Sequence, residues 1–288
     1  MSLVLAAVLS GCEKEVDVIP RDTPPVLVVE ATIENGRPPL VILSNSFQFF
    51  DSLGLVDLEK SFIKGAEVTI SNGQRTVRLE EYEEDLLDRK WTYYTISRTN
   101  PGQAMIGTLK TAYSLNIVTS GKSYSAQTFI PDTSRRIIDI WWKQGLNEKD
   151  SSLVNVFVKI TDPPGLGNYI RWFTSVNDSA FLPGFGSVVD DALIDGTTYD
   201  VQIFRSYSRN ADIDSETFGY FRRGEKASVK LSNIDKGTFD FWRTWEQNAS
   251  NQGNPFGTPV KILTNIKGGA TGYFAGYASQ IKTIRIPD

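Results

Sequence analysis

Short runs of β-branched and aromatic residues, separated by turn residues, recur along most of this chain and constrain its fold more than any other feature. Residues 66–70 alternate apolar and polar side chains, and residues 76–79 do so again. Between them stand Asn72 and Gly73, a pair that strongly favours a β-hairpin. Many short strands with regular turns are typical of β-sandwiches, so we predict a mainly β protein.

The predicted strands fall into two groups. Pro131 and the polar residues after it mark a boundary between them. We therefore predict an Ig-like or transthyretin-like β-sandwich over residues 26–131 and a second antiparallel β domain, a sandwich or an open barrel, over residues 135–288. The remaining strands are predicted at residues 26–33, 40–43, 91–96, 114–118, 123–130, 137–142, 154–160, 169–176, 199–204, 227–231, 260–263, 272–275 and 281–286.

One helix interrupts the strand pattern of the second domain, near residues 235–249. Phe239, Trp242 and Glu246 recur at helical spacing, and so do other aromatic residues beside them. Asn233 or Asp235 is suited to cap the first turn of such a helix. We expect the aromatic side chains to form the buried stripe that packs this helix against the sheet.

Two residue types set limits on the chemistry of the chain. It has no histidine and only one cysteine, Cys12. Catalytic arrangements of the Ser-His-Asp or Cys-His kind are therefore excluded, and so is an internal disulfide. The net charge of −4 does not suggest a nucleic-acid-binding protein, which needs a basic face. We expect a protein that is not an enzyme.

Cys12 stands where a lipoprotein signal peptide is cleaved. Residues 3–9 form an apolar run that is far shorter than the roughly 20 residues of a membrane-spanning helix. The run is long enough for a signal peptide, and it leads into Leu9, two small residues and Cys12, a match to the bacterial lipobox. We predict a signal peptide and lipobox over residues 1–12, with palmitate or a related acyl chain on Cys12. No Lys or Arg precedes the run, so we expect the natural start to lie upstream of Met1.

A charged segment follows the predicted lipid anchor. Residues 13–25 are predicted to be a tether that ends in Pro24 and Pro25. Acidic residues directly after the cysteine resemble the signal that sends lipoproteins of Bacteroidota to the outer face of the outer membrane. We therefore expect a lipid-anchored protein that is exposed on the cell surface.

The order and spacing of several motifs resemble one family. The chain is similar to the Bacteroidota lipoproteins known as domain of unknown function 4249. This resemblance implies an accessory role beside a TonB-dependent outer-membrane receptor, and it brings no catalytic residues. The matching segments are Cys12, residues 28–30, 65–70, 121–124, 160–163, 167–169, Arg171, residues 190–196, 254–256, Pro259, Asn265, Ile266, Gly269, Gly272 and Phe274.

Four aromatic residues are candidates for binding a ligand. Trp141 and Trp142 are adjacent, so on a strand they face opposite sides and cannot both enter one core. Phe181 and Phe185 lie in a segment rich in Pro and Gly that is predicted to be a loop. An exposed ring in either place suits a glycan or a peptide ligand. The simpler alternative is that these rings pack within their own domain.

Carboxylates provide the remaining candidates. Asp190, Asp191 and Asp195 offer oxygen ligands that suit Ca²⁺, but they match no calcium-binding loop motif. We prefer to interpret them as part of a solvated acidic loop, and we predict no metal and no other cofactor. A pair of carboxylates at the separation that a glycosidase needs is not recognisable from sequence.

These observations favour a non-enzymatic surface lipoprotein that assists TonB-dependent nutrient uptake by ligand capture or complex assembly. One alternative is a carboxylate-dependent hydrolase such as a glycosidase. The other is a structural or adhesive protein of the cell envelope. A hydrolase would require two carboxyl groups that face each other across a cleft and have perturbed pKa values.

Overall fold

The computed structural model describes residues 25–46, 59–86, 89–100, 102, 104–145, 150–208, 211–251, 257–258 and 260–288. The predicted signal peptide, Cys12 and nearly all of the tether lie outside these ranges. Within them the protein is mainly β, as predicted, with one long helix, α2 (Lys236–Ser250). None of the described helical segments has the length and apolarity that a membrane-crossing helix requires. The strands are β1 (Leu27–Glu34), β2 (Leu40–Asn45), β3 (Glu67–Ser71), β4 (Thr76–Leu86), β5 (Arg89–Thr95), β6 (Thr111–Thr119), β7 (Lys122–Ile130), β8 (Arg136–Gln144), β9 (Leu153–Thr161), β10 (Tyr169–Val176), β11 (Leu182–Val189), β12 (Thr198–Ile203), β13 (Phe221–Arg222), β14 (Lys226–Ile234), β15 (Ile266–Lys267) and β16 (Thr271–Arg285).

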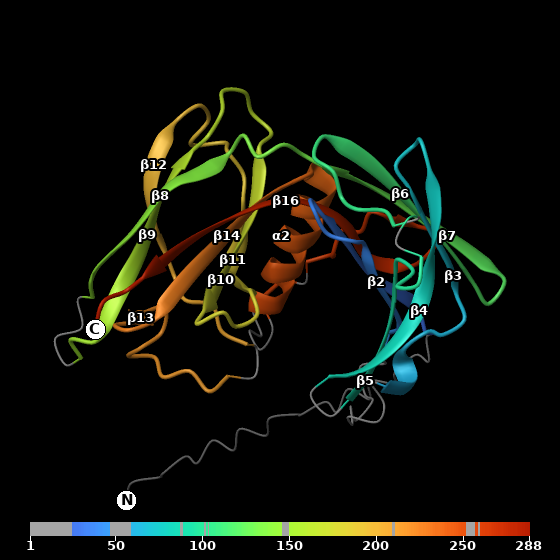
Figure 1. Cartoon of the computed structure of the whole chain (residues 1–288), viewed down its shortest axis with the longest axis horizontal. Helices are drawn as coiled ribbons and strands as arrows, with labels where there is room; N and C mark the ends of the chain where they lie inside the picture. Colours follow the sequence, from blue (N-terminus) through green and yellow to red (C-terminus); the bar gives the residue numbers. More distant parts are fainter. Residues whose placement is uncertain are drawn as a thin grey trace, which may run out of the picture.

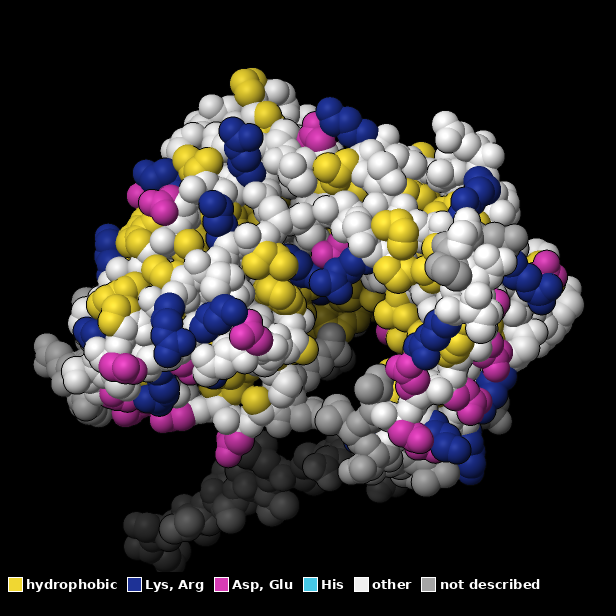
Figure 2. Space-filling view, in the orientation of Figure 1, with side chains coloured by type: hydrophobic (Ala, Val, Ile, Leu, Met, Phe, Trp, Pro, Cys, Tyr) yellow, Lys and Arg dark blue, Asp and Glu magenta, His cyan; other side chains and the backbone are white. Residues whose placement is uncertain are grey.

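The strands form one large sheet and one small one. The large sheet has the order β11-β10-β14-β16-β1-β2-β5-β4-β3-β6-β7-β15, and in the small one β9 pairs with β8, β12 and β13. Figure 1 shows the two groups of strands to the left and right, with α2 between them. The face in Figure 2 is hollowed between these groups, and basic and acidic side chains are interspersed over it.

Turn chemistry builds the hairpins of the first half. The predicted hairpin at Asn72 and Gly73 is confirmed: β3 and β4 pair antiparallel, and Gly73 has a φ of +84°. The β6–β7 hairpin turns through Ser120 and Gly121, which both have positive φ. This combination matches the twist of the flanking strands. The inward residues of these strands form the first hydrophobic core, together with side chains such as Phe274 from the end of the chain.

The last strand joins the two halves. The first part of β16 pairs parallel with β1, where Ala31 lies opposite Phe274. Its second part pairs antiparallel with β14, where Leu231 lies opposite Gln280. The side chain of Phe274 belongs to the first core, and Ile284, towards the end of the strand, packs against the second core. One strand, β16, is shared by the two groups of strands. The predicted domain boundary near Pro131 therefore stays a prediction.

Asp235, one of the two residues predicted to cap the helix, is the N-cap of α2. One of its carboxylate oxygens accepts a hydrogen bond from the backbone N–H of Thr238 at 2.7 Å. The other oxygen accepts from the Thr128 hydroxyl and the Phe129 backbone N–H on β7. Asp235 therefore caps the helix and ties it to the first half of the chain. Phe239 is buried on the inner side of α2, where it stacks on Tyr169.

Two predictions of local structure are wrong. The segment around Phe181 and Phe185 was expected to be a loop, but residues 182–189 form the edge strand β11. Residues 260–263 were expected to be a strand, and the structure gives them no regular secondary structure. In both cases local composition was a poor guide to backbone pairing. Pairing depends on neighbours that are distant in sequence.

Candidate functional site

A large cavity lies beside the second half of α2, and we call it the α2 cleft. It has a volume of about 720 Å³, a size suited to a small molecule. Its lining comes from β10, β11, the second half of α2, residues 205–208, Ile213 and Phe218. The lining residues are Arg171, Pro183, Gly184, Phe185, Gly186, Val188, Arg205, Ser206, Tyr207, Ser208, Ile213, Phe218, Arg243, Trp245, Glu246, Gln247, Asn248, Ala249 and Ser250.

The strand β11 forms one wall of the α2 cleft in spite of its Pro and Gly residues. Pro183 is tolerated because β11 is an edge strand. Gly184 lies flat against Trp172, and a Cβ atom at this position would stand 2.0 Å from the indole ring. Gly186 has a φ of +61°, which other residues rarely adopt. This backbone leaves the side chain of Phe185 81% exposed at the cleft.

A buried arginine lies at the inner end of the α2 cleft. Arg171 extends from β10 and is only 5% exposed. Its Nε donates to the Ser187 hydroxyl and its Nη1 donates to the Tyr277 hydroxyl, both at 3.1 Å. The guanidinium carbon lies 3.4 Å from the ring centroid of Trp242, whose Nε1 also donates to Tyr277. Arg171 therefore contacts β11, β16 and α2, the elements that enclose it.

Glu246 is linked to this arginine through Ser187. The Ser187 hydroxyl and its backbone N–H both donate to the Glu246 carboxylate. Burial raises the pKa of Glu246 above its ordinary value, although the hydrogen bonds from Ser187 and the charge of Arg171 oppose this shift. Arg171, Ser187 and Glu246 thus form a connected polar cluster at the α2 cleft.

The raised pKa of Glu246 predicts how stability depends on pH. A carboxyl group with a raised folded-state pKa stabilises the protein in its protonated form, and this contribution is lost as pH rises through that pKa. As pH rises from about 4, the ordinary pKa of a glutamate, the unfolding free energy of the wild type should therefore fall relative to that of Glu246→Gln. Urea unfolding at several pH values checks this. Glu67→Gln, on the exposed side of β3, is the control and should show no such trend; a matching trend there would contradict the assignment.

Charged and aromatic side chains form the outer part of the α2 cleft. Arg205 pairs with Glu225 at 2.9 Å, and Arg243 pairs with Asp240 at 3.5 Å. The rings of Tyr207 and Phe218 stack with their centroids 5.9 Å apart. An aromatic wall of this kind suits a flat apolar group.

The four predicted ligand-binding aromatics lie in different places. Trp142 packs against the second core, while Trp141 lies on the other face of β8 and stacks on Phe157. Phe181 is half-buried and packs against the hydrophobic cluster that contains Phe239 of α2. Phe185 is the one of these four that lines the α2 cleft. A ligand-binding role stays a prediction for all four.

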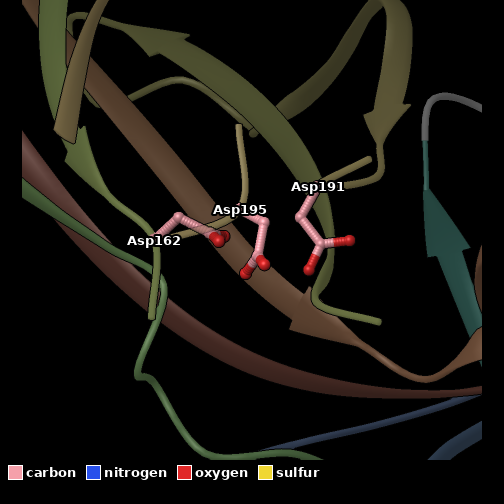
Figure 3. Close-up of side chains that lie close together, drawn as sticks. All are labelled: Asp162, Asp191 and Asp195. Carbon is pink, nitrogen blue, oxygen red and sulfur yellow. The ribbon is translucent and has the colours of Figure 1, made fainter. Parts of the chain in front are cut away.

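Three aspartates gather in a second cluster, away from the α2 cleft. Oxygen atoms of Asp162, Asp191 and Asp195 lie within 4.8 Å of one another, as a metal site would require. Figure 3 shows the carboxylates of Asp162 and Asp195 turned towards each other, with Asp191 to one side. The expectation of a solvated acidic loop is wrong for Asp191, which is 2% exposed because it packs against the backbone of Gly167 and Asn168.

Hydrogen bonds within the protein engage all three carboxylates. Asp191 accepts from the backbone N–H groups of Gly167 and Asn168. Its pKa is lowered, because these bonds outweigh the raising effect of burial. Asp195 accepts from the Gly165 backbone N–H, and Asp162 faces Arg135 at 3.2 Å. The hydrogen bonds of Asp191 and Asp195 tie the loop of residues 190–196 to the loop of residues 163–168.

Sequence reasoning missed most of the α2 cleft. The sequence indicated Arg171 only as part of a family motif, and Glu246 only as one of the residues at helical spacing in the predicted helix. Tyr207 and Phe218 carried no signal at all. An isolated Arg within the apolar β10 was the one available hint, because charged residues are seldom buried without a partner.

The comparisons with known proteins place the chain in a family. A family model described as a domain of unknown function (DUF4249) matches residues 13–283. The chain therefore belongs to this family, as its motifs suggested. A comparison with curated proteins finds no match.

Proposed function

We propose that this protein is a non-enzymatic lipoprotein of the outer-membrane surface, and that it captures a small ligand in the α2 cleft for a TonB-dependent receptor. The cleft carries this proposal, because it combines a volume of about 720 Å³ with a buried arginine and exposed aromatic rings. Clefts with apolar walls and a few polar groups are the usual form of ligand sites.

The carboxyl groups of the α2 cleft favour binding over hydrolysis. A glycosidase needs two carboxyl groups placed across its substrate. Among the described lining residues, Glu246 is the only carboxylate. Its hydrogen bonds run to Ser187, within the wall of the cleft, which suits a structural role better than proton transfer.

The lipid anchor is tested by Cys12→Ala in the full-length precursor. We expect this variant to leave the membrane fraction, because the thiol that carries the lipid is gone. Membrane fractionation followed by immunoblotting measures the change. Ser10→Ala keeps a small residue in the lipobox and is expected to remain with the membrane. An alanine variant at Cys12 that still fractionates with outer membranes would contradict the anchor.

The receptor is tested by co-purification. The wild-type protein, extracted in mild detergent, is expected to carry a large outer-membrane receptor with it. Mass spectrometry of the purified complex identifies the partner. Purification without any such receptor, across several growth conditions, would count against the proposal and favour a structural or adhesive role.

A further inference from the structure

Arg171 differs from the other two arginines of the α2 cleft. Arg205 and Arg243 each have an acidic partner within 3.5 Å. Arg171 is far more buried than either, yet no carboxylate lies within 4.0 Å of it in the part of the chain that the structure describes. Buried charges are normally paired, because leaving water is costly for an ion. Arg171 therefore lacks a directly paired negative charge, and it lines a cleft that a ligand could enter.

The hydrogen bonds of Arg171 show where that partner would bind. Nε and Nη1 donate to Ser187 and Tyr277, and one face of the guanidinium covers Trp242. Nη2 has no hydrogen-bond partner among the described residues. A guanidinium held rigidly in this way presents its remaining N–H groups in a fixed direction, which suits a carboxylate oxygen.

The surroundings of Arg171 limit the charge and shape of the ligand. Glu246 lies in the same cleft and contributes its own negative charge when ionised, so a doubly charged anion such as a phosphate monoester is disfavoured. The outer walls are aromatic: Phe185 is 81% exposed, and Phe218 is 45% exposed and stacked on Tyr207. These rings offer an apolar surface to a ligand that reaches inwards to Arg171.

We infer that the α2 cleft binds a small monocarboxylate that carries an apolar ring, with the carboxylate on Arg171 and the ring against Phe185 and Phe218. This inference rests on the proposed capture of a ligand, and it adds the chemical class of that ligand.

The charge requirement is tested with matched probes and the unmodified full chain. Isothermal titration calorimetry compares N-acetyl-L-phenylalanine, its neutral amide, and phenyl phosphate. A charged hydrogen bond at a partly desolvated site contributes enough for the acid to bind about tenfold to a hundredfold more tightly than the amide. Equal binding of acid and amide, tighter binding of phenyl phosphate, or no binding of the acid would each overturn the inference.

Two variants connect the binding to the cleft. Arg171→Lys keeps the positive charge and loses the planar fork, so we expect the preference for acid over amide to shrink at least about fivefold. Thermal unfolding and near-ultraviolet circular dichroism establish whether this variant folds. Phe185→Ala removes an exposed ring, and affinity for the acid is expected to fall about fivefold with little change in stability.

Leu193→Ala is the matched control for Phe185→Ala, because Leu193 is 97% exposed and lies outside the α2 cleft. It should bind N-acetyl-L-phenylalanine as the wild type does. Equal losses in both variants, or a Phe185→Ala variant that binds normally, would overturn the placement of the ring. Co-purification with a receptor does not depend on these probes, so a failed ligand class and a failed association with a receptor give different results.

Discussion

Replacing Asp162 with alanine is expected to lower the free energy of unfolding by about 3–5 kcal/mol, because it leaves a buried guanidinium without its counter-charge. The side chains of Asp162 and Arg135 are both 0% exposed, and Oδ1 of the first lies 3.2 Å from Nε of the second. Arg135 also donates to the carbonyl oxygen of Asn168 and to the hydroxyl of Tyr199. The pair therefore stands where the linker between the two halves meets the loops of the second half.

Urea unfolding of Asp162→Ala beside Asp200→Ala checks this prediction. Asp200 forms an exposed ion pair with Lys159 at 3.1 Å, and loss of such a pair typically costs less than about 1 kcal/mol. The double variant Arg135→Met with Asp162→Leu should lose much less than the sum of the single changes at the two positions. Similar losses for Asp162→Ala and Asp200→Ala would show that burial does not set the energy of this pair.

Replacing Phe274 with alanine is expected to destabilise the protein by about 3–5 kcal/mol. Phe274 is 0% exposed and packs in the first core from β16. Its backbone lies opposite Ala31 in the parallel pairing with β1 and is also held by two hydrogen bonds with the side chain of Asn265, which leaves little freedom to close a cavity. The loss therefore includes both the buried ring and the empty space that remains.

The same strand provides the control for this variant. Ile281 lies in the second part of β16 and is 49% exposed, so Ile281→Ala should change stability by about 0.5 kcal/mol or less. Chemical denaturation followed by tryptophan fluorescence measures both variants. Equal effects at Phe274 and Ile281 would mean that β16 is not anchored by the first core.

Local patterns predict much of this fold. Alternation marks strands such as β3, β4 and β9, and the turn residues between β3 and β4 define their hairpin. The helix near residues 235–249 and its cap Asp235 also follow from spacing and capping chemistry. These features depend on residues that are close in sequence, so a single sequence contains the necessary information.

The sheet order and the α2 cleft depend on contacts between distant segments. The local sequence of residues 182–189 does not predict a strand, because it contains Pro and Gly. The structure shows why these residues are present: Gly184 packs against the ring of Trp172, and Pro183 is tolerated on an edge strand. The same holds for the cleft, where Arg171 and Glu246 meet through Ser187 from three separate elements. Phe185 was identified from sequence because it lies in a segment rich in Pro and Gly, whereas Arg171 was not identified as a site residue.

The pairing of β1 with β16 has a consequence for the order in which the molecule folds. The register joins Val28 to Thr271, two residues that are very far apart in sequence. Contacts between distant segments form slowly, because a long loop must close before they can stabilise the chain. We therefore expect the pairing of β1 with β16 to form late in folding, after local hairpins such as β3–β4 and β6–β7.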